Sequence, residues 1–497
     1  MEDQVQQAFV EIPEVIRGAR RASVQHFHNR VGSTQVAARR LSSEVFVIPL
    51  EAADRFLIYA PLRRVAFVGN SACVNLLADL GDSAAAHSDA TEHVELVEFL
   101  RRVKIIDSDP ERLPITEFAG DPEPTALTLF LTTACNLRCA YCYASAGDMP
   151  ARSMDLLTAK RGIDYVALNA RKNNRKHFEL TYHGGGEPTT HWKVLVASFE
   201  YAQQRADELG LRAEGFTATN GVLTDLQIDW VTRNLAGASV SFDGLPSAHD
   251  ANRPTVLGQP SSGRVMRTLH RFDESGLPYG LRVTVTAGQI EALPESVAFV
   301  CSNFNPQRIQ VEPTYKLGRG QRAPSADSAA FIRAFRSAAA VAASAGRELL
   351  FSAARVDVLT NHFCGVTQDT FALSPGGSVS ACYEVFAEED VLADRFFYGA
   401  SDAAGSGFRF DLHVLDGLRS QAVQYRSFCE CCFAKWHCAG DCYHKSLSVD
   451  DATPFAGTDR CHITRELTKD QLLARIAAAG GAFWCGAPVE WVQEDPM

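Results

Sequence analysis

Residues 135–143 read Cys-Asn-Leu-Arg-Cys-Ala-Tyr-Cys-Tyr and directly follow an apolar, β-rich run at Thr128–Thr132. Three thiols on one short loop can hold three irons of a [4Fe–4S] cube, whereas a closed cluster takes four cysteines. The missing fourth ligand leaves one iron open to a small molecule. A zinc site that lacks its fourth ligand and a redox-active thiol pair are the alternative interpretations of this loop.

Five further β-rich runs follow the first one, and helical patterns such as 156–168, 194–206 and 265–272 separate them. These runs are Phe178–Tyr182, Phe216–Thr219, Ser239–Phe242, Leu281–Val285 and Ile309–Val311. Strands that alternate with helices predict βαβ units and a parallel sheet. Six such units predict an α/β fold with a partial (β/α)6 barrel, similar to a TIM barrel but open on one side. Binding sites on such sheets form beyond the carboxyl ends of the strands.

Polar residues and glycines gather where these runs end. Gly184-Gly185-Gly186-Glu187 comes after the second run, and consecutive glycines let backbone atoms approach a ligand closely. Asn220 follows the third run, Asp243 the fourth, and Arg282 lies inside the fifth. Each has an ordinary explanation taken singly, such as a turn or a solvated charge. Their recurrence at successive strand ends favours one shared site.

The cysteine spacing, with an aromatic residue before the third cysteine, resembles the signature of the radical S-adenosylmethionine (SAM) superfamily. The resemblance implies that Cys135, Cys139 and Cys142 hold a [4Fe–4S] cluster and that SAM binds its open iron. It further implies a SAM pocket made by Gly184, Gly185, Gly186, Glu187, Asn220, Asp243 and Arg282, in which Arg282 would pair with a carboxylate. Cleavage of SAM by the reduced cluster would then give a 5′-deoxyadenosyl radical.

A second group of cysteines occupies the last third of the chain. Cys364 precedes Gly377-Ser378-Val379-Ser380-Ala381-Cys382, and Cys429, Cys432, Cys438, Cys442 and Cys461 follow. The Cys-x-x-Cys pair alone would fit a zinc ribbon equally well. The order of all seven resembles the SPASM domain, an iron–sulfur extension of radical SAM peptide and protein maturases.

By that resemblance Cys429, Cys432, Cys438 and Cys461 close one auxiliary cluster, while Cys364, Cys382 and Cys442 supply three ligands of another. The chain would then carry three [4Fe–4S] clusters in all. The second auxiliary cluster lacks one ligand. Its remaining iron is open to substrate, or Cys431, Cys485 or a non-cysteine group fills the position. Cys73 and Cys301 read as ordinary buried thiols.

The sequence of residues 44–106 predicts a small α+β unit. Residues 1–43 form a separate N-terminal segment before it. Three strand patterns at 45–48, 56–59 and 65–68 precede helical patterns at 72–80 and 92–103. This order resembles the winged-helix leader-binding domain of the pyrroloquinoline quinone pathway, which captures a peptide as an added strand. A packing cap on the next domain is the alternative.

A proline-rich, acidic stretch at 107–123 reads as a linker to the predicted barrel domain (124–345). A SPASM-like domain would follow at 346–497, with a helix at 464–478 closing over it.

Composition narrows the classes of function. The 497 residues are 46% hydrophobic and 22% charged, which is typical of globular domains. A net charge of −11 argues against a nucleic-acid binder with a broad basic surface. The acidic start of the chain predicts no secretory signal, and the alanine-rich stretch at 338–345 is too short to span a bilayer. We therefore expect a cytoplasmic protein with no membrane or nucleic-acid partner.

The resemblance implies an enzyme that modifies a ribosomally made precursor peptide, with a thioether or carbon–carbon cross-link as the expected product. Its other partner would be an external electron donor such as a ferredoxin or flavodoxin. Anaerobic sulfatase maturases share the architecture but carry an acidic residue after the second SPASM cysteine, where this chain has Tyr383. Tyr383, Glu384 and Asp441 are the candidate catalytic bases, with surface or supporting positions as the alternative. A non-catalytic iron–sulfur or leader-binding adaptor is the remaining alternative.

Overall fold

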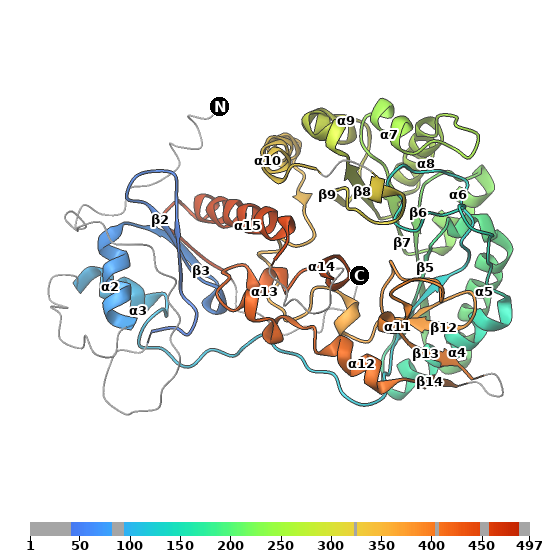
Figure 1. Cartoon of the computed structure of the whole chain (residues 1–497), viewed down its shortest axis with the longest axis horizontal. Helices are drawn as coiled ribbons and strands as arrows, with labels where there is room; N and C mark the ends of the chain where they lie inside the picture. Colours follow the sequence, from blue (N-terminus) through green and yellow to red (C-terminus); the bar gives the residue numbers. More distant parts are fainter. Residues whose placement is uncertain (1–40, 82–93, 323–325, 403–406, 448–456, 487–497) are drawn as a thin grey trace.

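The computed structural model describes residues 41–81, 94–322, 326–402, 407–447 and 457–486. Figure 1 shows a small N-terminal unit on one side and the open barrel on the other; the region with most of the cysteines lies partly between them and partly beside the barrel. This last region, residues 346–479, is called the auxiliary region below. In the described part of the chain, no helix combines the length and the apolar character needed to cross a membrane.

Six parallel strands form the centre of the large sheet, at the positions that the alternation predicted. They are β4 (Ala126–Phe130), β5 (His177–His183), β6 (Arg212–Thr219), β7 (Gly237–Ser241), β8 (Tyr279–Val285) and β9 (Arg308–Pro313). They pair in chain order, and β4 and β9 pair with other strands rather than with each other. The described strands therefore form an open barrel, as six βα units predict.

Helices that follow these strands cover the outside of the barrel (Figure 1). They are α4 (Leu156–Lys172), α5 (Trp192–Leu209), α6 (Asp225–Asn234), α7 (Pro246–Asn252), α8 (Ser262–Ser275), α9 (Leu293–Asn303) and α10 (Ser328–Ser344). Side-chain caps begin several of them. The Asp155 carboxylate accepts a hydrogen bond from the Thr158 amide, and Thr224 and Gln227 form a reciprocal capping box.

The sheet does not stop at the edges of the barrel but continues into the auxiliary region. β11 (Ala372–Leu373) pairs in parallel with β4 and leads on to β12 (Ser378–Ser380), β13 (Phe397–Ser401) and β14 (Phe408–Phe410). At the opposite edge, β10 (Leu349–Leu350) pairs with β9. Both edges of the open barrel are thus covered by later parts of the chain, which removes two unpaired strand edges.

Helices of 4 to 20 residues form much of the rest of the auxiliary region. They are α11 (Ala393–Phe396), α12 (Leu412–Arg419), α13 (Lys435–Cys438), α14 (Tyr443–Ser446) and α15 (Asp459–Ala478). Leu373, Val379 and Tyr398 share one continuous buried core with the barrel strands. The auxiliary region is therefore packed as an extension of the barrel.

The N-terminal unit is an antiparallel sheet with two helices, α2 (Ser71–Gly81) and α3 (Val94–Arg102). Its strands are β1 (Phe46–Pro49), β2 (Phe56–Ala60), β3 (Val65–Gly69) and β15 (Phe483–Cys485), in that order across the sheet. The first three strands lie where the sequence predicted them. The first two residues of the predicted helix 92–103 lie outside the described residues. The fourth strand comes from residues that the sequence assigned to the last domain.

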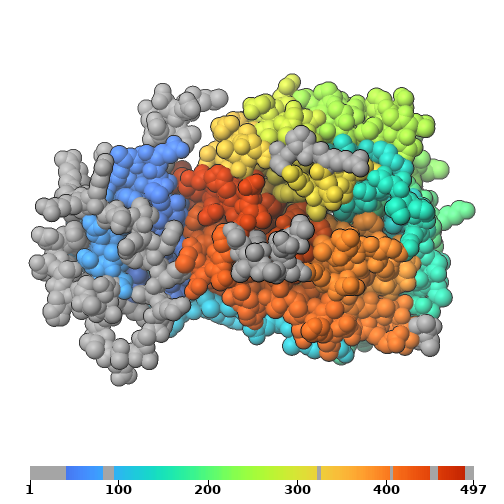
Figure 2. Space-filling view, viewed as in Figure 1, coloured from blue at the N-terminus to red at the C-terminus, as the bar shows by residue number. Residues whose placement is uncertain are grey.

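Buried polar contacts join the N-terminal unit to the auxiliary region. Glu44 accepts hydrogen bonds from the Trp436 indole (2.5 Å) and the Lys435 ammonium (3.1 Å), and the Tyr59 hydroxyl contacts the His437 ring. Leu472 of α15 packs on the same face of the sheet as Tyr59. The predicted linker 107–123 contains no helix or strand, and His362 and Asn361 bond to its Thr116 backbone. The unit is thus docked firmly on the auxiliary region (Figure 2).

Candidate active site at the open end of the barrel

The loop with Cys135, Cys139 and Cys142 follows β4 and lies at the carboxyl ends of the parallel strands. Burial raises the pKa of the Cys135 thiol to about 12, and Glu187, Cys139 and Cys142 add to this effect. The three thiols are therefore close neighbours. Iron would reverse the effect, because a metal holds its thiol ligands in the deprotonated form.

Two segments that the sequence did not single out hold this loop. The backbone of 252–256 pairs with it, through Arg138 N to Pro254 O (2.8 Å) and Ala140 N to Asn252 O (2.8 Å). From the far side of the barrel, Arg319 donates from Nε to the Cys139 carbonyl and from its backbone N to the Cys142 carbonyl, both at 3.0 Å. In the sequence, the Gly318-Arg319-Gly320 triplet after the sixth strand run could have pointed to this contact. Gly318 must approach the loop closely, because a Cβ at this position would lie 2.3 Å from the Cys142 carbonyl oxygen.

The glycine segment after β5 lies against the cluster loop. A Cβ on Gly186 would lie 2.1 Å from the Ala134 carbonyl, and one on Gly185 would lie 2.1 Å from the Phe386 ring. The Glu187 backbone N donates to the Ala134 carbonyl (2.8 Å). Only glycine fits this close approach, which explains the run of three.

Glu187 and Asn220 tie two strand ends to the same loop. The buried Glu187 carboxylate accepts hydrogen bonds from Thr189, from the Thr219 hydroxyl (2.9 Å) and from the Asn220 backbone N (2.7 Å). The Asn220 amide donates to Asn136 Oδ1 (2.7 Å), and its Nδ2 lies 3.7 Å from Cys135 Sγ. Most of the acceptor capacity of Glu187 is therefore used within the protein.

Asp243 is also committed to protein contacts. It forms a buried ion pair with Arg253 (3.1 Å) and accepts hydrogen bonds from the Tyr141 hydroxyl and the Thr284 backbone N. The Arg253 guanidinium in turn lies 5.1 Å from the centre of the Tyr141 ring. In this structure Asp243 positions Tyr141, the aromatic residue that precedes the third cysteine of the loop.

Arg282 differs from these residues because the described contacts give it no hydrogen bond or ion pair, and its side chain is exposed. Its charge reaches His183 and Tyr143. Burial, with Arg282 adding to it, lowers the pKa of His183 to about 4, and among the described residues Nδ1 of this neutral ring has no hydrogen-bond partner. An unpaired guanidinium beside an unsatisfied ring nitrogen fits a ligand that carries a carboxylate, such as the amino-acid end of SAM.

The auxiliary cysteines fall into two groups. Burial raises the thiol pKa of Cys382 and Cys442; Cys364 and Cys442 add to this effect at Cys382, and Cys364 adds to it at Cys442. In the other group, burial raises the thiol pKa of Cys429 and Cys438. Cys432 and Cys461 add to the effect at Cys429, and Cys429, Cys432 and Cys461 add to it at Cys438. These groups have the membership that the SPASM resemblance implies. In the described residues, no three cysteine, histidine or acidic side chains are gathered as ligands of a single metal ion.

The candidates for the fourth ligand beside Cys364, Cys382 and Cys442 lie in different places in the structure. Cys485 belongs to β15 in the N-terminal sheet and is exposed, and Cys431 is also exposed. Burial raises the thiol pKa of Cys364, Cys382 and Cys442, and the Glu384 carboxylate adds to this effect at all three. Glu384 is therefore a non-cysteine group whose charge acts on this group of thiols.

The three candidate bases lie in different environments. Glu384 is paired with Lys445 (3.0 Å) and His444 (2.8 Å); although burial opposes it, this pairing lowers the pKa of Glu384 to about 2, which makes it a weak base. Asp441 is paired with Arg460 (2.6 Å). The Tyr383 hydroxyl accepts a hydrogen bond from Thr128 (3.0 Å), and its ring lies 5.0 Å from that of His183. Tyr383 therefore faces the barrel strands, and the two carboxylates serve as ion-pair partners.

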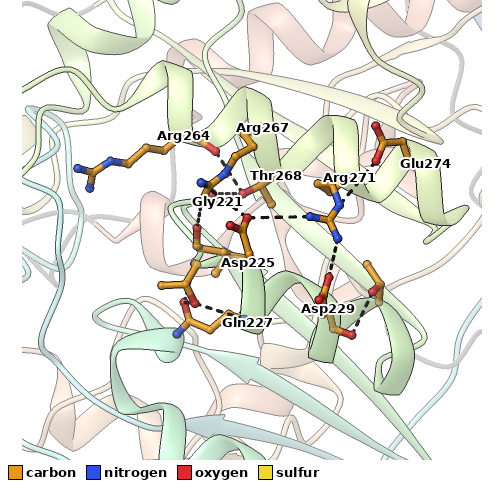
Figure 3. A network of polar contacts seen from close by, with 12 residues as sticks. Gly221, Asp225, Gln227, Asp229, Arg264, Arg267, Thr268, Arg271 and Glu274 are labelled. Atoms are coloured by element: carbon orange, nitrogen blue, oxygen red, sulfur yellow. Dashed lines mark hydrogen bonds and ion pairs between the residues drawn. The ribbon is translucent and has the colours of Figure 1, made fainter.

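A cavity of about 480 Å³ lies next to the cluster loop, which contributes Asn136 to its wall. Thr189, Thr224, Gln227 and Arg267 also line it, but none of the seven predicted SAM-pocket residues does. Figure 3 shows the contacts that join α6 to α8 at this wall, including Arg271 to Asp229 (2.5 Å). The cavity therefore adjoins the predicted SAM pocket, because Asn136 and Thr189 bond to Asn220 and Glu187, but the predicted pocket residues do not line it.

Comparison with known proteins matches residues 129–297 to the model of the radical SAM superfamily. The sporulation killing factor maturation protein SkfB of Bacillus subtilis is 26% identical over 204 residues, which are 39% of this chain and 44% of that protein. The mycofactocin maturase MftC of Mycolicibacterium smegmatis is 27% identical over 208 residues (40% and 47%). Fe-coproporphyrin III synthase of Methanosarcina barkeri is 28% identical over 191 residues (37% and 43%). The chain spans about half the length of the curated relatives it matches.

Among solved structures, native anSMEcpe with bound AdoMet and the Cp18Cys peptide covers 71% of this chain and 99% of its own length, with a TM-score of 0.57 and 16% identity. Native anSMEcpe with bound AdoMet gives a TM-score of 0.58. At this level of identity the likeness concerns the fold.

Proposed function

We propose that this chain, which contains a radical SAM domain, is an enzyme that uses SAM and iron–sulfur clusters to modify a ribosomally made precursor peptide. The observation that carries the proposal is the group of three neighbouring thiols at Cys135, Cys139 and Cys142, placed where the parallel strands end. When bound, the reduced cluster and SAM would supply a 5′-deoxyadenosyl radical that abstracts a hydrogen atom from an unactivated carbon.

The residues around this loop fit SAM with distinct roles. Arg282 would bind the carboxylate, since it is the charged group of the predicted pocket that makes no hydrogen bond or ion pair with the part of the chain that the structure describes. The glycine segment 184–186 would present backbone atoms to the amine of SAM. Glu187, Asn220 and Asp243 would act mainly by fixing the strand ends and the loop, because protein groups already use most of their hydrogen-bonding capacity.

The auxiliary thiols fit two further [4Fe–4S] clusters. Cys429, Cys432, Cys438 and Cys461 would hold one cluster completely, and Cys364, Cys382 and Cys442 would hold three irons of the other. The nearby Glu384 carboxylate is ionised, so it is the non-cysteine group best suited to the fourth position, provided that it leaves Lys445 and His444. Otherwise that iron is open to a substrate thiolate.

A peptide substrate is supported by the proteins that this chain resembles. Two relatives are named a maturation protein and a maturase, and the anSMEcpe structure holds a peptide. We infer that the product is a thioether or carbon–carbon cross-link, with electrons from an external ferredoxin or flavodoxin. Formylglycine formation is less well supported, because Tyr383 replaces the acidic residue expected there. A non-catalytic adaptor would not need the complete set of three loop thiols.

The test is anaerobic reconstitution with iron and sulfide, followed by SAM and dithionite. We expect 5′-deoxyadenosine to form and about 12 irons per chain to bind, four for each cluster. Formation of no 5′-deoxyadenosine above the level of a Cys135→Ala variant would contradict the enzyme assignment. About 4 irons or fewer, together with bound zinc, would contradict the auxiliary clusters. Cys431→Ser is the matched control, because Cys431 is exposed and lies outside both thiol groups.

The substrate is tested by incubation with the small peptide encoded beside this gene. A loss of about 2 Da, located by fragmentation, is expected for a cross-link, since two hydrogen atoms leave the peptide for each bond formed. Unchanged mass with uptake of deuterium would indicate epimerisation and would contradict the cross-linking proposal.

A further inference from the structure

Two arginines hold the backbone carbonyls of all three cysteines in the barrel loop. Arg138 donates from Nη1 to the Cys135 carbonyl (3.0 Å), and Arg319 donates from Nε to the Cys139 carbonyl (3.0 Å). The Arg319 backbone N donates to the Cys142 carbonyl (3.0 Å). Each residue whose thiol would bind the cluster is therefore in contact with one of these two arginines. Arg138 and Arg319 are called the arginine clamp below.

The glycines on both sides of Arg319 bring it against the loop. Gly318 has a positive φ of 49°, and a Cβ at this position would overlap the Cys142 carbonyl oxygen. A Cβ on Gly320 would lie 2.7 Å from the Tyr315 carbonyl oxygen. Because only glycine fits at these two positions, the turn is built for the close approach of Arg319 to the loop.

The charge of Arg319 acts on the thiols of the loop. Its side chain is 20% exposed and forms an ion pair with the partly exposed Asp148 (2.6 Å). Burial raises the pKa of the Cys139 thiol, and the charges of Arg253 and Arg319 oppose this effect. Arg138 also donates to the Leu137 carbonyl (2.9 Å) and has no carboxylate partner among the described residues. Both guanidinium charges of the clamp therefore lie beside the sulfur atoms that would bind iron.

Reduction adds one negative charge to an iron–sulfur cluster. A cation nearby stabilises the reduced form, since the reduction potential depends on the charge, hydrogen bonds and solvent exposure around the cluster. The buried Glu187 carboxylate, which adds to the raised pKa of the Cys135 thiol, has the opposite effect. The arginine clamp thus offsets a buried anion at the place where an electron has to arrive.

We propose that Arg138 and Arg319 are positioning residues which raise the reduction potential of the cluster bound by Cys135, Cys139 and Cys142, so that an external donor can reduce it. The inference rests on the proposed function, since that function requires this cluster. The charge of the clamp carries the effect, and its hydrogen bonds hold the charge in place.

The experiment titrates the reduced cluster by electron paramagnetic resonance of the anaerobically reconstituted chain at a series of fixed potentials. The signal that changes on addition of SAM identifies the cluster of the barrel loop. Arg319→Gln keeps amide donors but removes the charge, whereas Arg319→Lys keeps the charge. At a fixed potential, Arg319→Gln should lower the ratio of reduced to oxidised cluster at least about tenfold, which is about 59 mV for one electron. Arg319→Lys should stay within about twofold of the unchanged chain.

Equal potentials in Arg319→Gln and the unchanged chain overturn the inference. Arg205→Gln is the matched control, because the Arg205 side chain is 22% exposed and pairs with Asp164 (2.7 Å). It lies near the C-terminal end of α5, which leads to the amino end of β6 and away from the barrel loop. Its substitution should leave the ratio unchanged, and a shift equal to that of Arg319→Gln overturns the inference.

A stronger reductant separates a changed potential from a damaged site. With limiting dithionite, Arg319→Gln should form 5′-deoxyadenosine at least about fivefold more slowly than the unchanged chain. With titanium(III) citrate, a stronger reductant, it should return to within about twofold. Loss of formation with both reductants, in a variant that keeps its iron, overturns the inference because it assigns Arg319 a purely structural role.

If Arg319→Gln binds no iron, Arg138→Gln decides by the same titration. A ratio of reduced to oxidised cluster that is at least about threefold lower supports the inference, and an unchanged ratio overturns it. Normal 5′-deoxyadenosine formation by the unchanged chain, with no shift in either glutamine variant, overturns the inference alone. The absence of any SAM-sensitive cluster signal in the unchanged chain overturns the proposed function and the inference together.

Discussion

The barrel loop and the auxiliary region both gather cysteines, but they do so by different means. The three barrel thiols lie within a stretch of eight residues, 135–142. Hydrogen bonds from the backbone of 252–256 and from Arg319 fix their loop. The auxiliary thiols are spread from Cys364 to Cys461, and side-chain ion pairs such as Glu384 with Lys445 and Arg460 with Asp441 lie among them. A compact motif is thus supported by the fold around it, whereas a dispersed set depends on charged groups within it.

The largest expected effect separates the two regions by function. Cys139→Ala should lower 5′-deoxyadenosine formation by roughly three orders of magnitude or more, because the proposed SAM-binding cluster would need all three thiols. Cys382→Ala should leave SAM cleavage within about threefold but abolish the modified peptide, because it would remove a ligand of the proposed auxiliary cluster. Chromatography of 5′-deoxyadenosine and mass spectrometry of the peptide measure the two outcomes. Equal loss of SAM cleavage in both variants would show that the regions do not act separately.

The next effect concerns the buried ion pairs that support each region. Arg253→Met should lower the free energy of unfolding by about 3–5 kcal/mol, because it leaves Asp243 buried without its cation. Arg460→Met should cost a similar amount through Asp441. Thermal unfolding of the reconstituted proteins measures both changes. Lys172→Met is the control, since its pair with Glu123 is exposed and screened by solvent, so its loss should leave the free energy of unfolding nearly unchanged.

A smaller effect compares Arg282 in the barrel with Glu384 in the auxiliary region through the KM for SAM. Arg282→Met should raise the KM for SAM about 10–100-fold, since a charged hydrogen bond contributes about 1.5–3 kcal/mol. Glu384→Gln should leave the KM for SAM unchanged, because its partners are Lys445 and His444. Isothermal titration with SAM checks the affinity independently of turnover. An unchanged KM in Arg282→Met would remove Arg282 from the SAM pocket.

The smallest effect is a dependence of stability on pH that both regions share. Burial lowers the pKa of His249 in the barrel and of His437 in the auxiliary region to about 4, from an ordinary value of 6.5. The unfolded chain takes up a proton below pH 6.5 while the folded chain does not, so stability is lost as the pH falls from 6.5 towards 4. Each histidine should cost roughly 2 kcal/mol at pH 5 and nothing above pH 7.

Unfolding of the His249→Asn variant at pH 7 and pH 5 measures this contribution. The variant should lose less stability than the unchanged chain on acidification, and the exposed His413→Gln control should behave like the unchanged chain. A pH dependence that His249→Asn leaves unaltered would assign the effect to other groups.

The sequence predicted the barrel strands well because each is a β-rich run between helical patterns, and it predicted the loop cysteines because they are contiguous. It did not predict the support of that loop by Asn252 and Arg319, since those contacts join residues more than 100 positions apart. It also did not predict the extension of the sheet through β11. Strands of two or three residues are too short to show a periodicity, and their pairing is decided by the surface they meet.

The sequence predicted the location of Glu187 and Asp243 but not their hydrogen-bond partners. The motif indicated correctly that these residues lie at the strand ends, but residue type alone does not reveal whether a carboxylate faces a ligand or the protein. Their partners, the Asn220 backbone and Arg253, become visible only in the fold.

The pairing of β15 with β3 also has a consequence for how the chain is made. The residues of β3 leave the ribosome about 416 positions before Phe483, which at 5–20 residues per second is about 20–80 s. Throughout that interval the β3 edge is unpaired and open to association with other chains. The N-terminal unit would therefore be the part of a nascent chain most in need of a chaperone, and slower translation would lengthen its exposure.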